Sequence, residues 1–121
     1  MGGIEGQVSW VVQCAVKHGQ LDAFKELMGE MVAGTSEEPG TLNYEWFISD
    51  DGSTVHIYEK YADSEATMAH VKGFMEKWAG RFMRCVDVKG FTAYGNPDEA
   101  AQKAMEPFGG KLLGTWGGYA R

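Results

Sequence analysis

The chain has 121 residues, of which 44% are hydrophobic and 23% are charged. This length predicts a single domain, residues 1–121, that can bury a core without disulfide or metal staples. Seventeen acidic residues against eleven Lys and Arg give a net charge of −6, and the basic residues are scattered, so neither nucleic acid nor a membrane is an expected partner. No apolar run is long enough to span a bilayer, and we see no secretory leader, so we expect a cytoplasmic protein.

The first third of the chain predicts a tail, a strand and a helix. Residues 1–7 hold three glycines and no pattern, which indicates a frayed tail. Residues 8–17 (VSWVVQCAVK) are rich in β-branched residues and alternate, with Trp10 on the more apolar face, as in a central strand. Apolar residues then recur at helical spacing over 21–34, which predicts an amphipathic helix.

A hairpin comes next. Pro39-Gly40 stops the helix, and residues 42–48 and 55–61 both alternate, separated by the turn sequence SDDGS. Both faces of this strand pair carry large side chains. We therefore expect the chain's own helices to cover one face and a second subunit to cover the other.

The segment after the hairpin predicts a helical region and a fourth strand. Asp63 or Ser64 can cap a helix, and Gly73 interrupts its apolar series, so residues 64–84 predict two short helices or one kinked helix. Residues 85–94 alternate again, and Gly90 within them suggests a β-bulge or a close approach.

The element order is β-α-β-β-α-β, the split pattern of a ferredoxin-like α+β fold with a four-stranded antiparallel sheet. This core spans about residues 8–95. The remaining residues, 96–121, predict a C-terminal extension with a short helix ending near Met105 and an extended segment over 111–120.

Two cysteines, Cys14 and Cys85, lie far apart and form no CxxC pair. The default interpretation is two buried free thiols in a reducing cytosol. If the first and last strands of the core pair antiparallel, the two sulfurs come close, and a functional thiol pair stays open as an alternative. No Cys, His or carboxylate residues recur at metal-ligand spacing, His56 included, so we expect no metal site.

Three stretches carry a family resemblance: EPGTLNYEWF at 38–47, HIYEKYADSEATMAH at 56–70, and the fourth strand. Their order and spacing resemble the antibiotic biosynthesis monooxygenase-like family of dimeric α+β barrels. The C-terminal MEPFGG and GGYAR are similar to an extension found on some members. The resemblance implies a homodimer in which two sheets close into a barrel, with a pocket between sheet and helices in each subunit.

The family includes cofactor-independent oxygenases of quinols and polyketide phenols, haem-degrading enzymes, and proteins of no known activity. The first-strand asparagine of the haem degraders has no match among residues 11–13. Residues 74–76 (FME) also stand where members often carry a second histidine. The resemblance therefore implies no haem and, for an oxygenase, no cofactor.

His70 and Glu59 are the candidate catalytic residues. Oxygenation without a cofactor needs a base in an apolar pocket, and an ordinary histidine pKa of about 6.5 suits proton removal at neutral pH. Glu59 shares an apolar strand face and can act as a base or orient His70. The alternatives are a structural, hydrogen-bonded His70 and a Glu59 salt bridge across the dimer, for example with Arg81 or Arg84.

Aromatic side chains are the candidate substrate-binding residues, because they can stack on a planar molecule. The alternative is that most of them only pack in the core. His56 and Lys60 fall on the opposite strand face, where they suit a dimer interface. The candidates are Tyr44, Trp46, Trp10, Phe74 and Trp78.

These observations favour a monooxygenase-like protein acting on a small aromatic, quinol or polyketide-type substrate. Two other functions stay open: a non-catalytic binding or dimerisation module of the same fold, and an isomerase-like enzyme that uses His70 as an acid/base. An enzyme predicts a cavity bounded by Tyr44, Glu59, His70 and Trp78 that opens to solvent. A module predicts these groups interlocked with no void.

Overall fold

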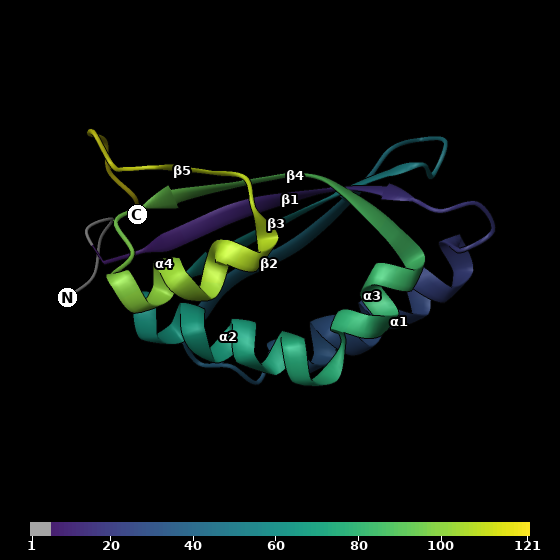
Figure 1. The fold of residues 1–121 in the computed structure, drawn as a ribbon, viewed down its shortest axis with the longest axis horizontal. Coiled ribbons are helices and arrows are strands. Elements are labelled where there is room, and N and C mark those ends of the chain that lie inside the picture. Colours follow the sequence, from purple (N-terminus) through teal and green to yellow (C-terminus); the bar gives the residue numbers. More distant parts are fainter. Residues whose placement is uncertain (1–5) are drawn as a thin grey trace.

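The structure, a computed structural model, describes residues 6–121 and consists of one sheet with helices on one side (Figure 1). The first five residues of the predicted tail lie outside the described residues. The elements in chain order are β1 (Val8–Val16), α1 (Leu21–Thr35), β2 (Thr41–Ile48), β3 (Thr54–Tyr61), α2 (Ser64–Lys77), α3 (Ala79–Cys85), β4 (Val86–Gly95), α4 (Glu99–Met105), the 3-10 helix η1 (Glu106–Phe108) and β5 (Lys111–Leu113).

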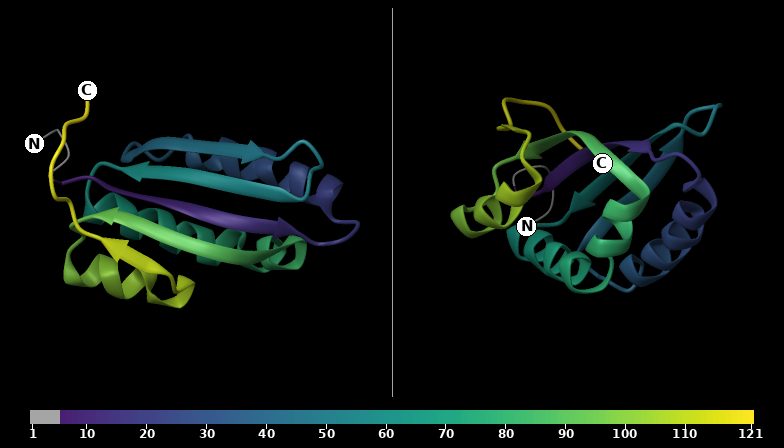
Figure 2. Two further views of the ribbon diagram at one scale, coloured as in Figure 1. Left: turned by 90° about the horizontal axis from the view of Figure 1, so that it is seen from above. Right: turned by 45° about the vertical axis from the view of Figure 1, so that its right-hand side comes forward.

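The strand order is β2-β3-β1-β4-β5, visible from above in the left view of Figure 2. β1 pairs antiparallel with β3 and β4, so Trp10 lies between Glu59 and Ala93. β2 pairs antiparallel with β3. The predicted βαββαβ core is confirmed. The sheet gains a fifth strand because β5 pairs parallel with β4, and of the predicted extended segment 111–120 only the first three residues form a strand.

The helices cover the inner face of the sheet, and α4 lies beside α2 at the end of the sheet near the chain termini (Figures 1 and 2). Alternate residues of β1 and β3, among them Val8, Trp10, Cys14 and Ile57, are buried beneath them. The outer face bears no helix from the described residues, as the side view of Figure 1 shows. Within residues 6–121 no helix has the length and apolar character needed to cross a membrane.

The helical region between the hairpin and β4 is divided, but not at the predicted place. α2 continues through Gly73 and ends at Lys77, and the break falls at Trp78, where φ is −128° and ψ is −18°. Glycine costs a helix only about 1 kcal/mol, which packing of the other residues can offset. Trp78 instead buries its indole against the bare backbone of Gly34 in α1. Cys85, expected to open the fourth strand, is the last residue of α3.

Two local predictions are confirmed. The side chain of Asp63 accepts a hydrogen bond of 2.8 Å from the backbone N–H of Ala66 and so caps α2. The pairing of β1 with β4 shifts between Gln13, which is opposite Gly90, and Cys14, which is opposite Val88. This shift is the β-bulge that the glycine in this strand suggested.

Candidate functional site

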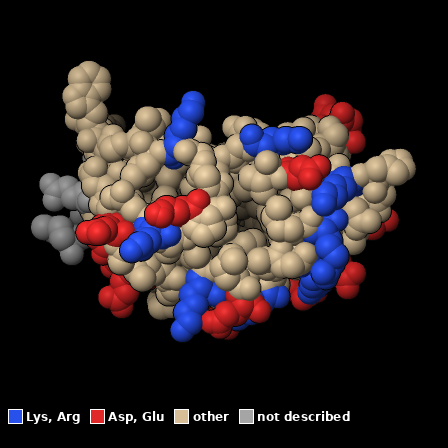
Figure 3. Space-filling model, in the orientation of Figure 1, with Lys and Arg blue, Asp and Glu red and all other residues tan. Residues whose placement is uncertain are grey.

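A cavity of about 160 Å³ lies between the inner face of the sheet and the helices. On the face drawn in Figure 3 the surface is hollowed between η1 and α3, where Met83 and Pro107 contribute to the cavity lining. The polar lining consists of Tyr44, Glu59 and His70. The rest of the lining is apolar and largely aromatic, including Trp10, Phe74, Phe82, Phe91 and Phe108.

His70 is held between two carboxylates. Its Nδ1 lies 2.9 Å from Oε1 of Glu38, and its Nε2 lies 3.2 Å from Oε1 of Glu59. The hydroxyl of Tyr61 donates to the same Glu59 oxygen, and the hydroxyl of Thr41 donates to Glu38 Oε1 at 2.8 Å. We call the three ionisable groups Glu38, Glu59 and His70 the charged cluster.

Three elements bring the charged cluster together. Glu59 is on the buried face of β3, two residues from the buried Ile57. His70 is on the buried side of α2, less than two turns from the helix start. Glu38 belongs to the loop before β2, which crosses close to α2: a side chain at Gly40 would begin 2.4 Å from the Cβ of Ala66. The glycine of the PG dipeptide therefore lets this loop reach His70.

The two carboxylates decide the charge of His70. Burial disfavours the imidazolium, but hydrogen bonds and charge attraction from Glu38 and Glu59 outweigh burial and raise the pKa of His70 to about 9. Burial also acts against the Glu38 carboxylate, yet its bond to His70 keeps the pKa of Glu38 below its ordinary value. At neutral pH the charged cluster thus holds an imidazolium between two carboxylates.

The two tyrosines near the charged cluster remain protonated. Burial, followed by the nearby Glu59 charge, raises the pKa of Tyr61 and of Tyr44 well above the ordinary phenol value. Tyr61 is fully buried and uses its proton to bind Glu59. Tyr44 lies with its ring centroid 5.5 Å from that of His70 and presents its side chain to the cavity.

Four aromatic rings, Trp10, Phe74, Phe91 and Phe108, form an aromatic wall of the cavity. The ring of Phe91 in β4 lies 5.3 Å from Trp10 and 5.6 Å from Phe108, and the ring of Phe74 lies 6.2 Å from Phe108, measured between centroids. Such spacings are typical of tilted and edge-on aromatic packing. A planar apolar molecule in the cavity would therefore meet both the aromatic rings and the polar side chains of the lining.

Five of the seven predicted site residues line this cavity: His70, Glu59, Tyr44, Trp10 and Phe74. The other two, Trp46 and Trp78, lie in the adjoining core. Trp46 packs against Phe24 at a centroid distance of 5.3 Å, and its indole nitrogen is buried without a hydrogen-bond partner among residues 6–121. The predicted cavity with an opening is present, but Trp78 does not bound it.

Arg81, one of the alternative partners for Glu59, is paired elsewhere in the chain. Arg81 binds Glu30 through two contacts of 2.8 Å on the surface. Glu59 is instead bonded to His70 and Tyr61. Sequence reasoning missed Glu38, because nothing local marks a carboxylate before PG as the partner of a residue 32 positions away. It also missed Phe91 and Phe108, which only the folded chain brings together.

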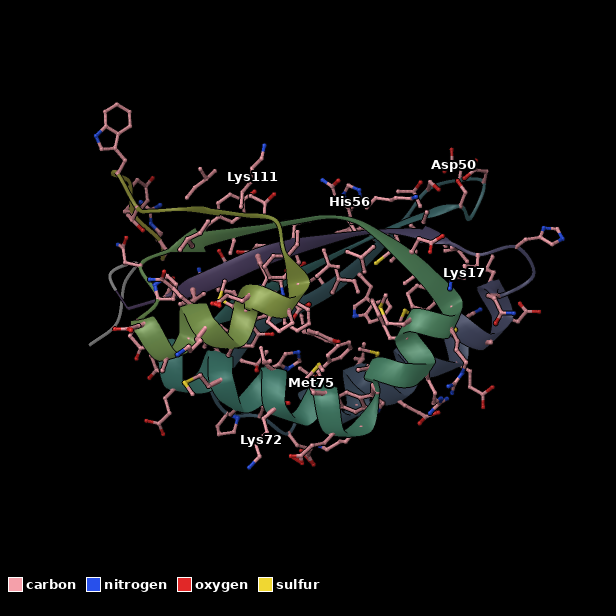
Figure 4. All side chains as sticks on the ribbon, viewed as in Figure 1. Lys17, Asp50, His56, Lys72, Met75 and Lys111 are labelled. Carbon is pink, nitrogen blue, oxygen red and sulfur yellow. The ribbon has the colours of Figure 1, made fainter. Side chains whose placement is uncertain are left out.

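The remaining chemically capable residues lie apart from the cavity lining. Cys14 and Cys85 are buried free thiols of one core cluster, and burial, aided by the Glu59 charge, raises the pKa of Cys14 to about 12. His56 is exposed on the outer side of the sheet, where Figure 4 labels it. Within residues 6–121 no three His, Cys, Asp or Glu side chains are grouped so that they could hold a metal ion.

Comparison with solved structures shows the same fold. MupZ from Pseudomonas fluorescens matches with a TM-score of 0.82 at 20% identity, covering 100% of this chain and 94% of its own. Rv0793 from Mycobacterium tuberculosis matches with a TM-score of 0.66 at 21% identity, covering 78% of this chain and 98% of its own. SnoaB, a cofactor-independent oxygenase from Streptomyces nogalater, matches with a TM-score of 0.64 at 16% identity, covering 77% of this chain and 95% of its own.

Sequence comparison gives the family directly. No curated protein matches the chain. The family model described as antibiotic biosynthesis monooxygenase matches residues 8–78. This match covers more than half of the chain, from β1 through the end of α2, and includes Glu38, Glu59 and His70. The chain therefore belongs to the antibiotic biosynthesis monooxygenase family.

Proposed function

We propose that the protein is a monooxygenase that needs no cofactor and acts on a small aromatic molecule with an ionisable hydroxyl, such as a phenol or a quinol. The observation that carries the proposal is the charged cluster at the wall of an otherwise apolar cavity. Buried charges are costly unless they are fully paired or take part in a reaction. The charged cluster lies beside an open cavity, and this position indicates a catalytic role. The likeness in fold to SnoaB, a cofactor-independent oxygenase, agrees with this reaction class.

The charged cluster can take up one proton as a unit, because it holds two carboxylates and one imidazolium. We assign Glu59, at the cavity wall, as the group through which the substrate proton enters. His70, predicted from the sequence as the base, is already protonated below about pH 9, so its role is to stabilise the substrate anion. The aromatic wall excludes water from this anion.

The anion then reacts with oxygen. It passes one electron to O2, and the two radicals combine into a C–O bond at a ring carbon that bore two hydrogens in the keto tautomer. The resulting peroxide loses water, so that one oxygen atom stays as a carbonyl and the other leaves as water. Oxidation of the CH2 group to a carbonyl supplies all four electrons that the reduction of O2 needs, and its two hydrogens leave in the water, so no external reductant enters.

Oxygen uptake tests the proposal. Purified protein with a chelator is offered one-ring quinols and polycyclic phenols, beside the variants Glu59→Gln and His70→Ala. We expect uptake that survives chelation and falls about 100-fold or more in Glu59→Gln, the size of a general-base contribution. The matched control is Glu30→Gln, which removes a surface carboxylate bound to Arg81 and should leave uptake unchanged.

A non-catalytic binding module is the second candidate. It is favoured by one observation: Glu59 is already engaged by both His70 and Tyr61, as in a structural network. Such a module binds the aromatic molecule without consuming oxygen. Binding of a phenol by calorimetry, with no uptake across the whole panel, would replace the oxygenase proposal with this one.

A further inference from the structure

The C-terminal extension builds one wall of the cavity. Pro107 and Phe108 of η1 are lining residues, although they come from outside the βαββαβ core. The Phe108 ring packs on Phe91 from β4 and Phe74 from α2, so it closes the space between the sheet and the helices. The ring therefore borders the cavity on the side of the C-terminal extension.

The extension is anchored on both sides of Phe108. On one side, the backbone N–H of Asp98 donates to Ser64 Oγ at 2.9 Å, and Ala101 and Met105 of α4 are buried. On the other side, Gly110 adopts φ 84° and passes so close to β4 that a Cβ would stand 1.9 Å from the carbonyl oxygen of Phe91. Only glycine fits there, and it turns the chain into β5.

The extension is not common to all proteins of this fold. Rv0793 and SnoaB match over nearly their full length, yet cover only 78% and 77% of this chain. Residues 8–95, the core, are 88 of the 121 residues, a similar share. MupZ, in contrast, covers the whole chain. Phe108 also lies outside residues 8–78, which the family model matches, so we take the wall that it provides as an addition to the shared core.

We propose that Phe108 is the specificity-determining residue of this cavity and restricts it to ligands with a single aromatic ring and one polar edge. The size supports the limit, because an apolar cavity of about 150 Å³ holds one benzene molecule, and this one measures about 160 Å³. The polar edge follows from the lining, whose polar side chains Tyr44, Glu59 and His70 lie within hydrogen-bonding or ring-packing distance of one another. The inference rests on the proposed function for the site, but concerns binding alone.

Calorimetric binding of two stable probes tests it: p-cresol with one ring, and 1,8-dihydroxyanthraquinone with three fused rings. We expect the full-length protein to bind p-cresol at least about tenfold more tightly than the three-ring probe. In Phe108→Ala the preference should be reversed, so that the three-ring probe binds at least about tenfold more tightly than p-cresol. Trp116→Ala is the matched control, because Trp116 is an aromatic residue of the same extension that is 99% exposed, and it should keep the native preference.

Equal binding of both probes by the unaltered protein would overturn the proposal, as would an unchanged preference in Phe108→Ala or no binding of either probe by any variant. Phe108→Leu keeps a large apolar side chain and serves if the alanine variant fails to fold. The affinity of Phe108→Leu for the three-ring probe should lie between those of the unaltered protein and Phe108→Ala. Since no turnover is measured, a protein that discriminates the probes but takes up no oxygen would contradict the proposed oxygenation and leave this inference standing.

Discussion

His70 is the residue whose protonation state controls the charge of the site. An isolated buried histidine would be neutral, because burial disfavours the imidazolium. Here carboxylates stand at both ring nitrogens, and Thr41 and Tyr61 in turn donate to those carboxylates. Each ring nitrogen therefore has a defined partner, which fixes the orientation of the ring as well as its charge.

The raised pKa of His70 makes the stability of the protein depend on pH. The pKa of His70 is about 9 in the folded state and about 6.5 ordinarily, so the protonated form of His70 stabilises the fold. The full contribution, at most about 3 kcal/mol, is present below the ordinary pKa and is lost as the pH rises through about 9. Urea unfolding from about pH 6 to about pH 10 should show this loss in the native protein and not in His70→Gln. Equal pH dependence of the two proteins would contradict the assignment.

Glu38 should account for part of the rise in the pKa of His70. Glu38→Gln keeps the shape of the side chain but removes the negative charge 2.9 Å from Nδ1, so the pKa of His70 should fall toward the ordinary value. NMR titration of the ring protons measures this directly. The control is Glu30→Gln, which removes a half-exposed carboxylate that is paired with Arg81 and should leave the His70 titration unchanged.

At the scale of elements, the contact between α1 and the break at Trp78 sets the helix packing. A Cβ on Gly34 would lie 2.7 Å from two atoms of the Trp78 ring, whereas a Cβ on Gly29 of the same helix meets nothing within 4 Å. Gly29→Ala should stabilise the protein by about 1 kcal/mol through helix propensity. Gly34→Ala should instead lower the free energy of unfolding by about 1–2 kcal/mol, since the clash outweighs that gain. Denaturant unfolding distinguishes the two.

The elements themselves were predictable because their signals are local. Alternation marked β1, β2 and β3, helical spacing marked α1, and Asp63 marked the start of α2. The helix break was placed wrongly because its cause is not local. Gly73 is a weak helix former within its own segment, but Trp78 departs from the helix to pack on a residue 44 positions earlier in the chain.

The site was predictable only in part, for the same reason. His70 and Glu59 stood out because a polar residue on an apolar face is visible in one segment. Glu38 reaches His70 from a loop, and Phe108 reaches Phe91 from the extension, and neither contact leaves a pattern in its own stretch. Trp46 and Trp78 were predicted to bind substrate but lie in the core beside the cavity. The spacing of aromatic residues along one segment does not show whether they face the core or the cavity.

At the scale of the whole molecule, the outer face of the sheet is the surface without a cover. No described helix lies over it (Figure 1), and apolar side chains are exposed there, including Phe47 at 55% and Leu113 at 53%. Its centre is formed by Val11 of β1, which is opposite Tyr58 of β3 and Thr92 of β4. An uncovered sheet face that exposes apolar side chains suits contact with another subunit.

We expect a second copy of the chain to cover this face, because the same surface on two identical subunits can meet about a two-fold axis. The protein should then sediment at about twice 13.3 kDa. Val11→Glu places a charge at the centre of the outer face and should shift the protein toward the monomer, since that carboxylate would be buried without a partner in the dimer. Met75→Glu is the control: Met75 is 53% exposed on α2, on the helix side (Figure 4), and a charge there should leave the dimer intact. A native protein that sediments as a monomer would contradict the dimer, while the cavity, which this chain forms alone, would remain.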